Sequence, residues 1–372
     1  MPGLTAISLF SGVGGLDLGA SRAGFDIRAA VEYEADAAAS LRANHFPETP
    51  YAVIQESIVD VPTDEILERG GLRRGEVDLV FGGPPCTPFS KSGYWLEYKR
   101  MGLDPNASLL QAFARVVKDV RPRALLLENV HSLAYKNHNR TPLLDLLLEF
   151  EEAGYSFSAG VFNAADYGVP QLRKRLIIYG TLGESPPRFP SPTHAGWTET
   201  KRVYDTRLLP YVTCHEAIGD LENRDDLCEE GEQVGGKFGQ LLPLVPPGDN
   251  YLYFTAKRGH PEPLFEWRSR YWTFLLKLDP HRPSTTIQAQ PGPYVGPFHW
   301  RNRRLRELEI KRLQTFPDDY IVVGSRRSVQ VQIGNAVPPL LGELVARPLA
   351  RHLMGECDTS VQAWQPSLLT LA

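Results

Sequence analysis

Residues 5–24 read "TAISLFSGVGGLDLGASRAG". A short apolar run passes through a cluster of glycines into a segment with helical spacing, and this strand–turn–helix order recurs along the first half of the chain. The further expected strands are 25–33, 77–83, 123–130 and 173–182, and the further expected helices are 34–45, 108–122 and 142–154. Strands separated by helices of this length predict βαβ units. We therefore expect an α/β fold with a mostly parallel, doubly wound sheet and helices on both faces.

Composition narrows the class of protein. The chain has 372 residues, a formal net charge of −4 and 42% hydrophobic residues, which is typical of a globular protein large enough for two domains. No apolar stretch approaches the roughly 20 residues of a membrane span, and the first residues lack the basic region of a signal peptide. The four cysteines form no CxxC pair, so a disulfide framework or metal site is disfavoured and the cytoplasm is the expected location.

The alternation of strands and helices stops near residue 183. We expect a first domain at 1–183, a second, irregular domain rich in Gly, Pro and aromatic residues at 184–300, a linking element at 301–324, and a helical segment at 325–372 that packs back on the first domain. Proline-dense sequence just after residue 183 is typical of a linker. One basic patch, "RNRRLRELEIKR", begins at residue 301, and local patches of this kind contact phosphates even in an acidic protein.

The glycine loop predicts a cofactor site. Gly12 and Gly14 fit the dinucleotide fingerprint, but Asp17 stands where a third glycine is needed, which disfavours an NAD-dependent oxidoreductase. Glu32, at the end of the second strand, is placed to bind ribose hydroxyls. Together these features indicate an adenosine cofactor without a pyrophosphate. From the loop alone, a tight strand-to-helix turn with an incidental glutamate remains the alternative.

Three reactive side chains follow strand ends in the same half. Cys86 lies past strand 77–83, Glu128 lies near the end of strand 123–130, and "QLRKRL" places Gln171, Arg173 and Arg175 at alternating positions that share one face if the segment is extended. Ligand crevices in open α/β sheets form at the carboxyl ends of strands. We therefore expect a thiol, a carboxylate and a guanidinium at one crevice.

These motifs resemble those of DNA (cytosine-5) methyltransferases of the bacterial restriction-modification type. The resemblance rests on "FSGVGGL" from residue 10, "GGPPCTPFS" from 82, "ENV" from 128, "QLRKR" from 171, "RRLRELEIKRLQTFPDDY" from 303 and "QIGNAVPP" from 332, in the family's order. It implies a Rossmann-like S-adenosylmethionine-dependent methyltransferase fold, with 184–300 as a smaller target-recognition domain and 301–324 as its supporting element. It also implies S-adenosyl-L-methionine as cofactor and double-stranded DNA as substrate.

The resemblance also implies roles for individual residues. Cys86 is the expected nucleophile at carbon 6 of a flipped cytosine, Glu128 binds ring nitrogen 3, Arg175 holds the carbonyl, and Asn129 and Arg173 support them. The expected cofactor residues are Phe10, Gly12, Gly14, Gly15, Glu32, Tyr33, Ser57, Ile58, Pro85 and Asn335. The expected DNA contacts are Lys91, Ser92, Lys99, Arg100, Arg303 and Arg304, with Trp267, Arg268 and Arg270 added by composition.

Two positions depart from the family pattern. Thr87 follows the cysteine where Gln is usual, and Ser57 stands where Asp often binds the adenine amino group, which leaves the backbone N–H of Ile58 for that contact. Two alternatives stay open: an RNA (tRNA) cytosine-5 methyltransferase and a non-catalytic nucleic-acid-binding relative. A cognate restriction endonuclease is a possible functional partner, a monomer is the expected state, and the DNA sequence recognised cannot be read from residues 184–300.

Overall fold

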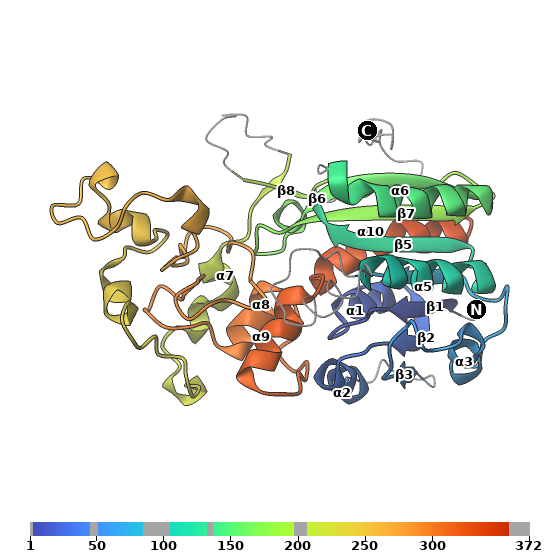
Figure 1. Cartoon of the computed structure of the whole chain (residues 1–372), viewed down its shortest axis with the longest axis horizontal. Coiled ribbons are helices and arrows are strands. Elements are labelled where there is room, and N and C mark those ends of the chain that lie inside the picture. The colour runs from blue at the N-terminus through green and yellow to red at the C-terminus, as the bar shows by residue number, and fades with distance from the viewer. Residues whose placement is uncertain (1–2, 45–50, 85–104, 132–136, 197–206, 357–372) are drawn as a thin grey trace.

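The computed structural model describes residues 3–44, 51–84, 105–131, 137–196 and 207–356 (Figure 1). One sheet organises the larger lobe, in the order β3-β2-β1-β4-β5-β7-β6. Its strands are β1 (Leu4–Leu9), β2 (Phe25–Val31), β3 (Ala52–Ile54), β4 (Leu79–Gly82), β5 (Ala124–Val130), β6 (Tyr155–Asn163) and β7 (Lys174–Leu182). The strands from β3 to β5 pair in parallel, whereas β7 runs antiparallel to both β5 and β6. The predicted α/β fold with a mostly parallel sheet is confirmed.

Helices cover both faces of this sheet. They are α1 (Gly15–Arg22), α2 (Ala35–Ala43), α3 (Thr63–Arg69), α5 (Pro105–Val120), α6 (Asn137–Glu152) and α10 (Pro339–Leu353). One buried core joins alternate strand residues such as Ile7 and Val80 to α3, α5 and α6, and the other joins Ala6 and Phe81 to α1 and α10. This arrangement follows from the alternation of side chains along a strand, which makes each strand apolar on both faces.

The C-terminal helix α10 packs against the first helix α1. The contact needs a glycine on α1, because a Cβ atom added to Gly19 would lie 2.7 Å from the Cα atom of Gly342. Arg123 adds a bond to the helix end, donating from Nη2 to the Leu353 carbonyl at 2.7 Å. The last described helix thus completes the cover of the sheet that the first helix begins.

The smaller lobe lies at the left of Figure 1 and is built mainly from short 3₁₀ turns and irregular chain. α7 (Cys214–Ile218) belongs to this part of the chain, and α8 (Glu307–Leu313) and α9 (Arg326–Asn335) lie between it and the larger lobe. β8 (His194–Ala195) and its partner β9 (Leu209–Pro210) lie beside the larger lobe, near the 3₁₀ turn that follows β6. The smaller lobe has its own apolar cluster around Tyr251, Phe254, Leu275 and Phe298. None of the helices in the described ranges has the length and hydrophobicity needed to cross a bilayer.

Candidate active site

The carboxyl end of β5 brings a carboxylate and a guanidinium together. Arg175 Nε lies 2.6 Å from Glu128 Oε1, and both side chains are about one-eighth exposed, 13% and 12% respectively. The contact follows from the sheet, because Arg175 on β7 is the antiparallel partner of Val130 on β5. Arg175 Nη1 also donates to the Lys174 carbonyl at 2.8 Å, which helps to fix the guanidinium at this edge.

The end of β4 is held against the same pair. A Cβ atom on Gly83 would lie 2.7 Å from Glu128 Oε2, so the carboxylate occupies space that a side chain would fill. Asn129 Nδ2 donates to the Pro84 carbonyl at 3.0 Å, and Asn129 Oδ1 accepts from the Val130 N–H at 2.8 Å. Gly83 was not among the predicted site residues, although a double glycine at a strand end indicates close approach of another group.

Gly83 and Pro84 lead directly into the segment that contains the predicted nucleophile. Pro85, Cys86 and Thr87 lie outside the described residues, as do the predicted DNA contacts Lys91, Ser92, Lys99 and Arg100. Cys86 nevertheless follows Pro84 by two residues in the sequence. The Pro84 carbonyl accepts a hydrogen bond from Asn129, the residue after Glu128.

Gln171 and Arg173 are fully buried and join three distant parts of the chain. Arg173 Nη2 donates to the carbonyls of Gly334 and Asn335 at 2.9 and 3.2 Å, and Gln171 Oε1 accepts from the Ile287 N–H at 3.1 Å. Burial and the nearby Arg175 lower the pKa of the Arg173 guanidinium. The two side chains therefore connect the residues before β7 with the end of α9 and with the segment at 287.

The glycine loop has the geometry of a ligand cradle. Gly12 has φ +56° with open space where a Cβ atom would stand, whereas a Cβ atom on Gly14 would lie 2.8 Å from the Tyr320 hydroxyl. Glu32 Oε2 accepts from the Gly12 N–H at 2.6 Å, and Oε1 accepts from the Glu34 N–H at 2.8 Å. Each carboxylate oxygen has a second lone pair that can accept from a ribose hydroxyl. The residues present therefore fit an adenosine cofactor.

The other predicted cofactor residues differ in exposure and in the groups that they can offer to a ligand. Tyr33 is 63% exposed, which leaves its ring available to a ligand. Ile58 is buried in the core, so a contact from this position would come from the backbone. Ser57 closes a turn by accepting from the Val59 N–H at 3.3 Å, and Asn335 is exposed at the end of α9.

Asp17, the residue that departs from the NAD fingerprint, is a buried carboxyl next to the glycine loop. It is fully buried in the first turn of α1, and Tyr51 donates to its Oδ1 at 3.4 Å. Burial raises the pKa of Asp17 to about 7, and bonds such as that from Ser8 oppose this shift. The group therefore titrates near neutrality beside the cofactor loop.

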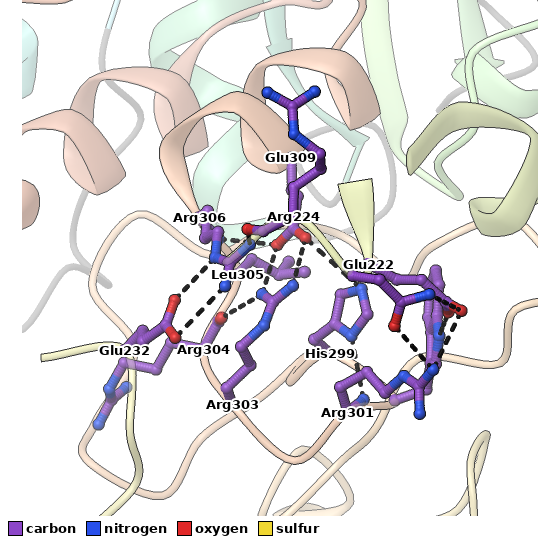
Figure 2. A network of polar contacts seen from close by, with 12 residues as sticks. Glu222, Arg224, Glu232, His299, Arg301, Arg303, Arg304, Leu305, Arg306 and Glu309 are labelled. Atoms are coloured by element: carbon purple, nitrogen blue, oxygen red, sulfur yellow. Dashed lines mark hydrogen bonds and ion pairs between the residues drawn. The ribbon is translucent and has the colours of Figure 1, made fainter. Parts of the chain in front are cut away.

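Arg303 and Arg304, both predicted to contact DNA, differ in exposure, and the prediction for Arg303 is corrected. Arg303 is buried and donates from both terminal nitrogens to Glu309 at 2.8 and 2.7 Å, so its guanidinium is not presented to DNA. Figure 2 shows this pair within a larger polar network. Arg304 is half-buried and donates to the Pro293 carbonyl at 2.7 Å. Arg303 also forms an isolated antiparallel bridge with Gln233.

The three residues added by composition lie on the surface of the smaller lobe. Trp267 is 38% exposed, and Lys257 Nζ lies 4.2 Å from the centre of its ring. Arg268 pairs with Glu266 at 3.0 Å, and Arg270 stacks over Tyr271 at 4.7 Å. These three residues are far from Glu128 and Arg175 in the sequence, and none of the contacts in the described part of the chain joins them to that pair.

Comparison with known proteins decides the family. The model for C-5 cytosine-specific DNA methylases matches residues 4–351. The chain belongs to this family. It is 47% identical to the Type II methyltransferase M.SacI of Streptomyces achromogenes, over 94% of this chain and 93% of that protein. It is 33% identical to the Type II methyltransferase M1.HphI of Haemophilus parahaemolyticus, over 94% and 87% of the two chains.

Solved structures agree on the fold. A putative DNA modification methyltransferase encoded within an E. coli prophage superposes with a TM-score of 0.62 at 23% identity, covering 95% of this chain and all of that one. A DNMT2 variant of Spodoptera frugiperda gives a TM-score of 0.61 at 16% identity, covering 93% and 99%. These structures confirm the predicted fold. Because the chain belongs to the C-5 cytosine-specific DNA methylases, it is an S-adenosylmethionine-dependent DNA (cytosine-5) methyltransferase, and the predicted activity and cofactor are confirmed.

Proposed function

We propose that this methyltransferase flips a cytosine out of double-stranded DNA and methylates its carbon 5 within a short specific sequence, with Cys86, Glu128 and Arg175 as the catalytic residues. The observation that carries the proposal is the Glu128–Arg175 pair beside Gly83 and Pro84, from which the chain continues to Cys86. Carbon 5 is unreachable inside a duplex, so the base must leave the stack, at a cost of a few kcal/mol.

The chemistry assigns one task to each side chain. The Cys86 thiolate adds to carbon 6 and breaks the 5,6 double bond, so that carbon 5 can take the methyl group. Loss of the carbon-5 proton to a base, which can be water, then restores the double bond and expels the thiolate. This suits sulfur because it is both a strong nucleophile and an adequate leaving group. Glu128 shares a proton with ring nitrogen 3 and offsets the charge that develops there. Arg175 orients Glu128 through Nε, and its remaining N–H groups can donate to the cytosine carbonyl. S-Adenosylmethionine, when bound, supplies an electrophilic methyl group on its sulfonium sulfur.

The cofactor would be held by the glycine loop and its surroundings. In this proposal Glu32 accepts from the ribose hydroxyls, Tyr33 packs on the adenine, and the Ile58 N–H makes the contact that the family often assigns to an aspartate. Asn335 closes the pocket from α9. The position of Glu32 supports a role in ribose binding, because the N–H groups of Gly12 and Glu34 hold its carboxylate next to the glycine loop.

We assign 1–183 to the catalytic domain, 184–300 to target recognition, 301–324 to its support and 325–372 to a segment that returns to the catalytic domain. The packing of α10 on α1 supports the last assignment. The identity to M.SacI, a Type II methyltransferase, supports a restriction-modification role with a cognate endonuclease. The enzyme is expected to act in the cytoplasm as a monomer.

The test is transfer of labelled methyl from S-adenosylmethionine to a mixed-sequence, unmethylated duplex DNA library and to bulk tRNA, with bisulfite sequencing of the products. We expect cytosine methylation in one short duplex motif, and none above background with Cys86→Ala. Label on tRNA alone would replace DNA by RNA as the substrate. Cofactor binding without transfer to either would favour the non-catalytic alternative.

A further inference from the structure

Val13 lies in the middle of the glycine loop, at a position for which no role was predicted from the sequence. Its side chain is fully buried in an apolar cluster to which α8 and Tyr320 also contribute. Ile287, from the segment 184–300, belongs to the same cluster. The loop assigned to the cofactor therefore shares an apolar core with the parts of the chain assigned to target recognition and its support.

The peptide group that joins Val13 to Gly14 is held at both of its polar atoms. Tyr320 Oη donates to the Val13 carbonyl at 2.6 Å, and the Gly14 N–H donates to the Ser11 carbonyl at 2.9 Å. Gly14 is the residue before α1 and has φ +82°, a conformation that favours glycine. The peptide plane therefore cannot rotate without breaking these bonds, and a buried carbonyl that loses its partner is costly.

Tyr320 is itself fixed by the segments on either side of it. Lys311 Nζ donates to the Tyr320 carbonyl at 2.9 Å, and both side chains are buried. The next residue, Ile321, forms two hydrogen bonds with Asn44, just after α2: its N–H donates to Oδ1 at 2.8 Å, and its carbonyl accepts from Nδ2 at 2.6 Å. Burial raises the pKa of Tyr320, so its hydroxyl stays protonated and donates. Tyr320 thus connects α8 and α2 to the glycine loop.

We propose that Tyr320 is a positioning residue that holds the glycine loop in the conformation that binds S-adenosylmethionine. The inference rests on the proposed function, which assigns the cofactor to this loop. In the same conformation the Gly12 N–H donates to Glu32 at 2.6 Å, which sets the carboxylate assigned to the ribose. Without the tyrosine hydroxyl, the loop exchanges with conformations in which the Val13 carbonyl finds another partner. The apparent affinity for the cofactor then falls in proportion to the fraction of molecules that keep the binding conformation.

The experiment compares Tyr320→Phe with Tyr155→Phe as the matched control. Tyr155 is also buried, and its hydroxyl donates to a backbone carbonyl, that of Pro122, at 2.8 Å. Pro122 precedes β5, whereas the glycine loop follows β1; because β1, β4 and β5 are parallel, the control bond lies at the opposite edge of the sheet. Glu32→Gln reports whether the loop binds the cofactor. For each protein, calorimetry measures S-adenosylhomocysteine binding, methyl transfer to the duplex DNA library gives KM and kcat, and thermal unfolding gives the midpoint.

We expect Tyr320→Phe to weaken S-adenosylhomocysteine binding and to raise KM for S-adenosylmethionine by the same factor, about 2- to 10-fold, the range for one hydrogen bond. The kcat value at saturating cofactor should stay within about twofold of the wild type, because the bound cofactor restores the loop. Tyr155→Phe should lower only the thermal midpoint.

Wild-type cofactor affinity in Tyr320→Phe, or an equal loss of affinity in Tyr155→Phe, would overturn the proposal. A fall in kcat with unchanged KM would also overturn it. If Glu32→Gln binds weakly while Tyr320→Phe binds like the wild type, only the role of Tyr320 fails. If both variants bind like the wild type, the assignment of the cofactor to this loop fails as well.

Discussion

Two glutamate–arginine pairs of nearly equal geometry occupy different environments in this enzyme. Glu128 and Arg175 meet at 2.6 Å at the edge of the sheet, whereas Glu309 and Arg303 meet at 2.7 Å at α8, between the two lobes. The first pair is about one-eighth exposed and lies against Gly83, which has no side chain. In the second pair the glutamate is fully buried. The two pairs therefore differ in whether a ligand can reach the carboxylate.

The surroundings of Glu309 are saturated by the protein itself. The Arg306 N–H donates to Glu309 at 2.8 Å, and the buried His299 ring lies 3.5 Å away. Burial lowers the pKa of His299 to about 2, so this ring is neutral and the charge of Glu309 is balanced by arginines, with Arg303 in direct contact. A saturated pair stabilises the fold, whereas an open pair is available to a substrate. Glu309 therefore has a structural environment, and the environment of Glu128 fits the catalytic role proposed for it.

Glu128→Gln gives the largest expected effect on the open pair. The amide cannot deliver the shared proton to ring nitrogen 3, so we expect methyl transfer to fall by about 10²- to 10⁴-fold, the typical contribution of a general acid. The thermal midpoint should change little, because the side chain lies at the edge of the core. Single-turnover methylation and thermal unfolding measure the two effects. If the variant unfolds at a lower temperature but each folded molecule keeps normal activity, Glu128 would be a structural and not a catalytic residue.

Glu309→Gln should show the opposite pattern. Removing one partner of a buried pair leaves an uncompensated Arg303 charge, which costs roughly 3–5 kcal/mol in the free energy of unfolding. Activity at low temperature should persist in the fraction that remains folded. Glu65→Gln is the control, because the Glu65–Arg69 pair is exposed and such pairs contribute less than about 1 kcal/mol. Equal effects of the two substitutions in urea unfolding would contradict the comparison.

The sequence predicted the open pair better than the saturated one, for physical reasons. The end of β5 follows from an apolar run, and parallel strands direct their carboxyl ends to one edge of the sheet, which predicts that Glu128 lies beside the end of β4, as it does. The saturated pair depends on chain contacts such as Gln233 with Arg303, which no local pattern encodes. The short β3 and α3 and the polar-alternating β6 were not predicted, and the antiparallel direction of β7 required knowledge of its partner strands.

Gly83→Ala tests how closely the open pair fits its surroundings. The new methyl group would lie 2.7 Å from Glu128 Oε2 and must displace the carboxylate. Because a misplacement of about 1 Å can cost 100-fold in rate, we expect up to about that loss in methyl transfer, with a smaller change in thermal midpoint than in Glu309→Gln. Unchanged single-turnover rates would show that Glu128 has more freedom than the geometry indicates.

Asp17→Asn gives the smallest expected effect and concerns a third carboxyl, one with no basic partner among its described contacts. Burial raises its pKa from 3.8 to about 7, so the native state binds more protons than the unfolded state between these values, and wild-type stability falls as pH rises through that range. The asparagine variant lacks this penalty. Its thermal midpoint relative to the wild type should therefore be higher at pH 8 than at pH 5. An equal difference at both pH values would contradict the assigned shift.

The most direct test of the account is covalent trapping on duplex DNA that carries 5-fluorocytosine within the methylated motif. The fluorine cannot be removed as a proton, so the bond from the Cys86 sulfur to carbon 6 should persist after methyl transfer. We predict a denaturant-stable protein–DNA complex with the wild type, much slower formation with Glu128→Gln, unchanged formation with Glu65→Gln, and none with Cys86→Ala. A complex that forms equally well without the thiol, or equally fast without the Glu128 carboxylate, would contradict the assignment of this pair and this loop to catalysis.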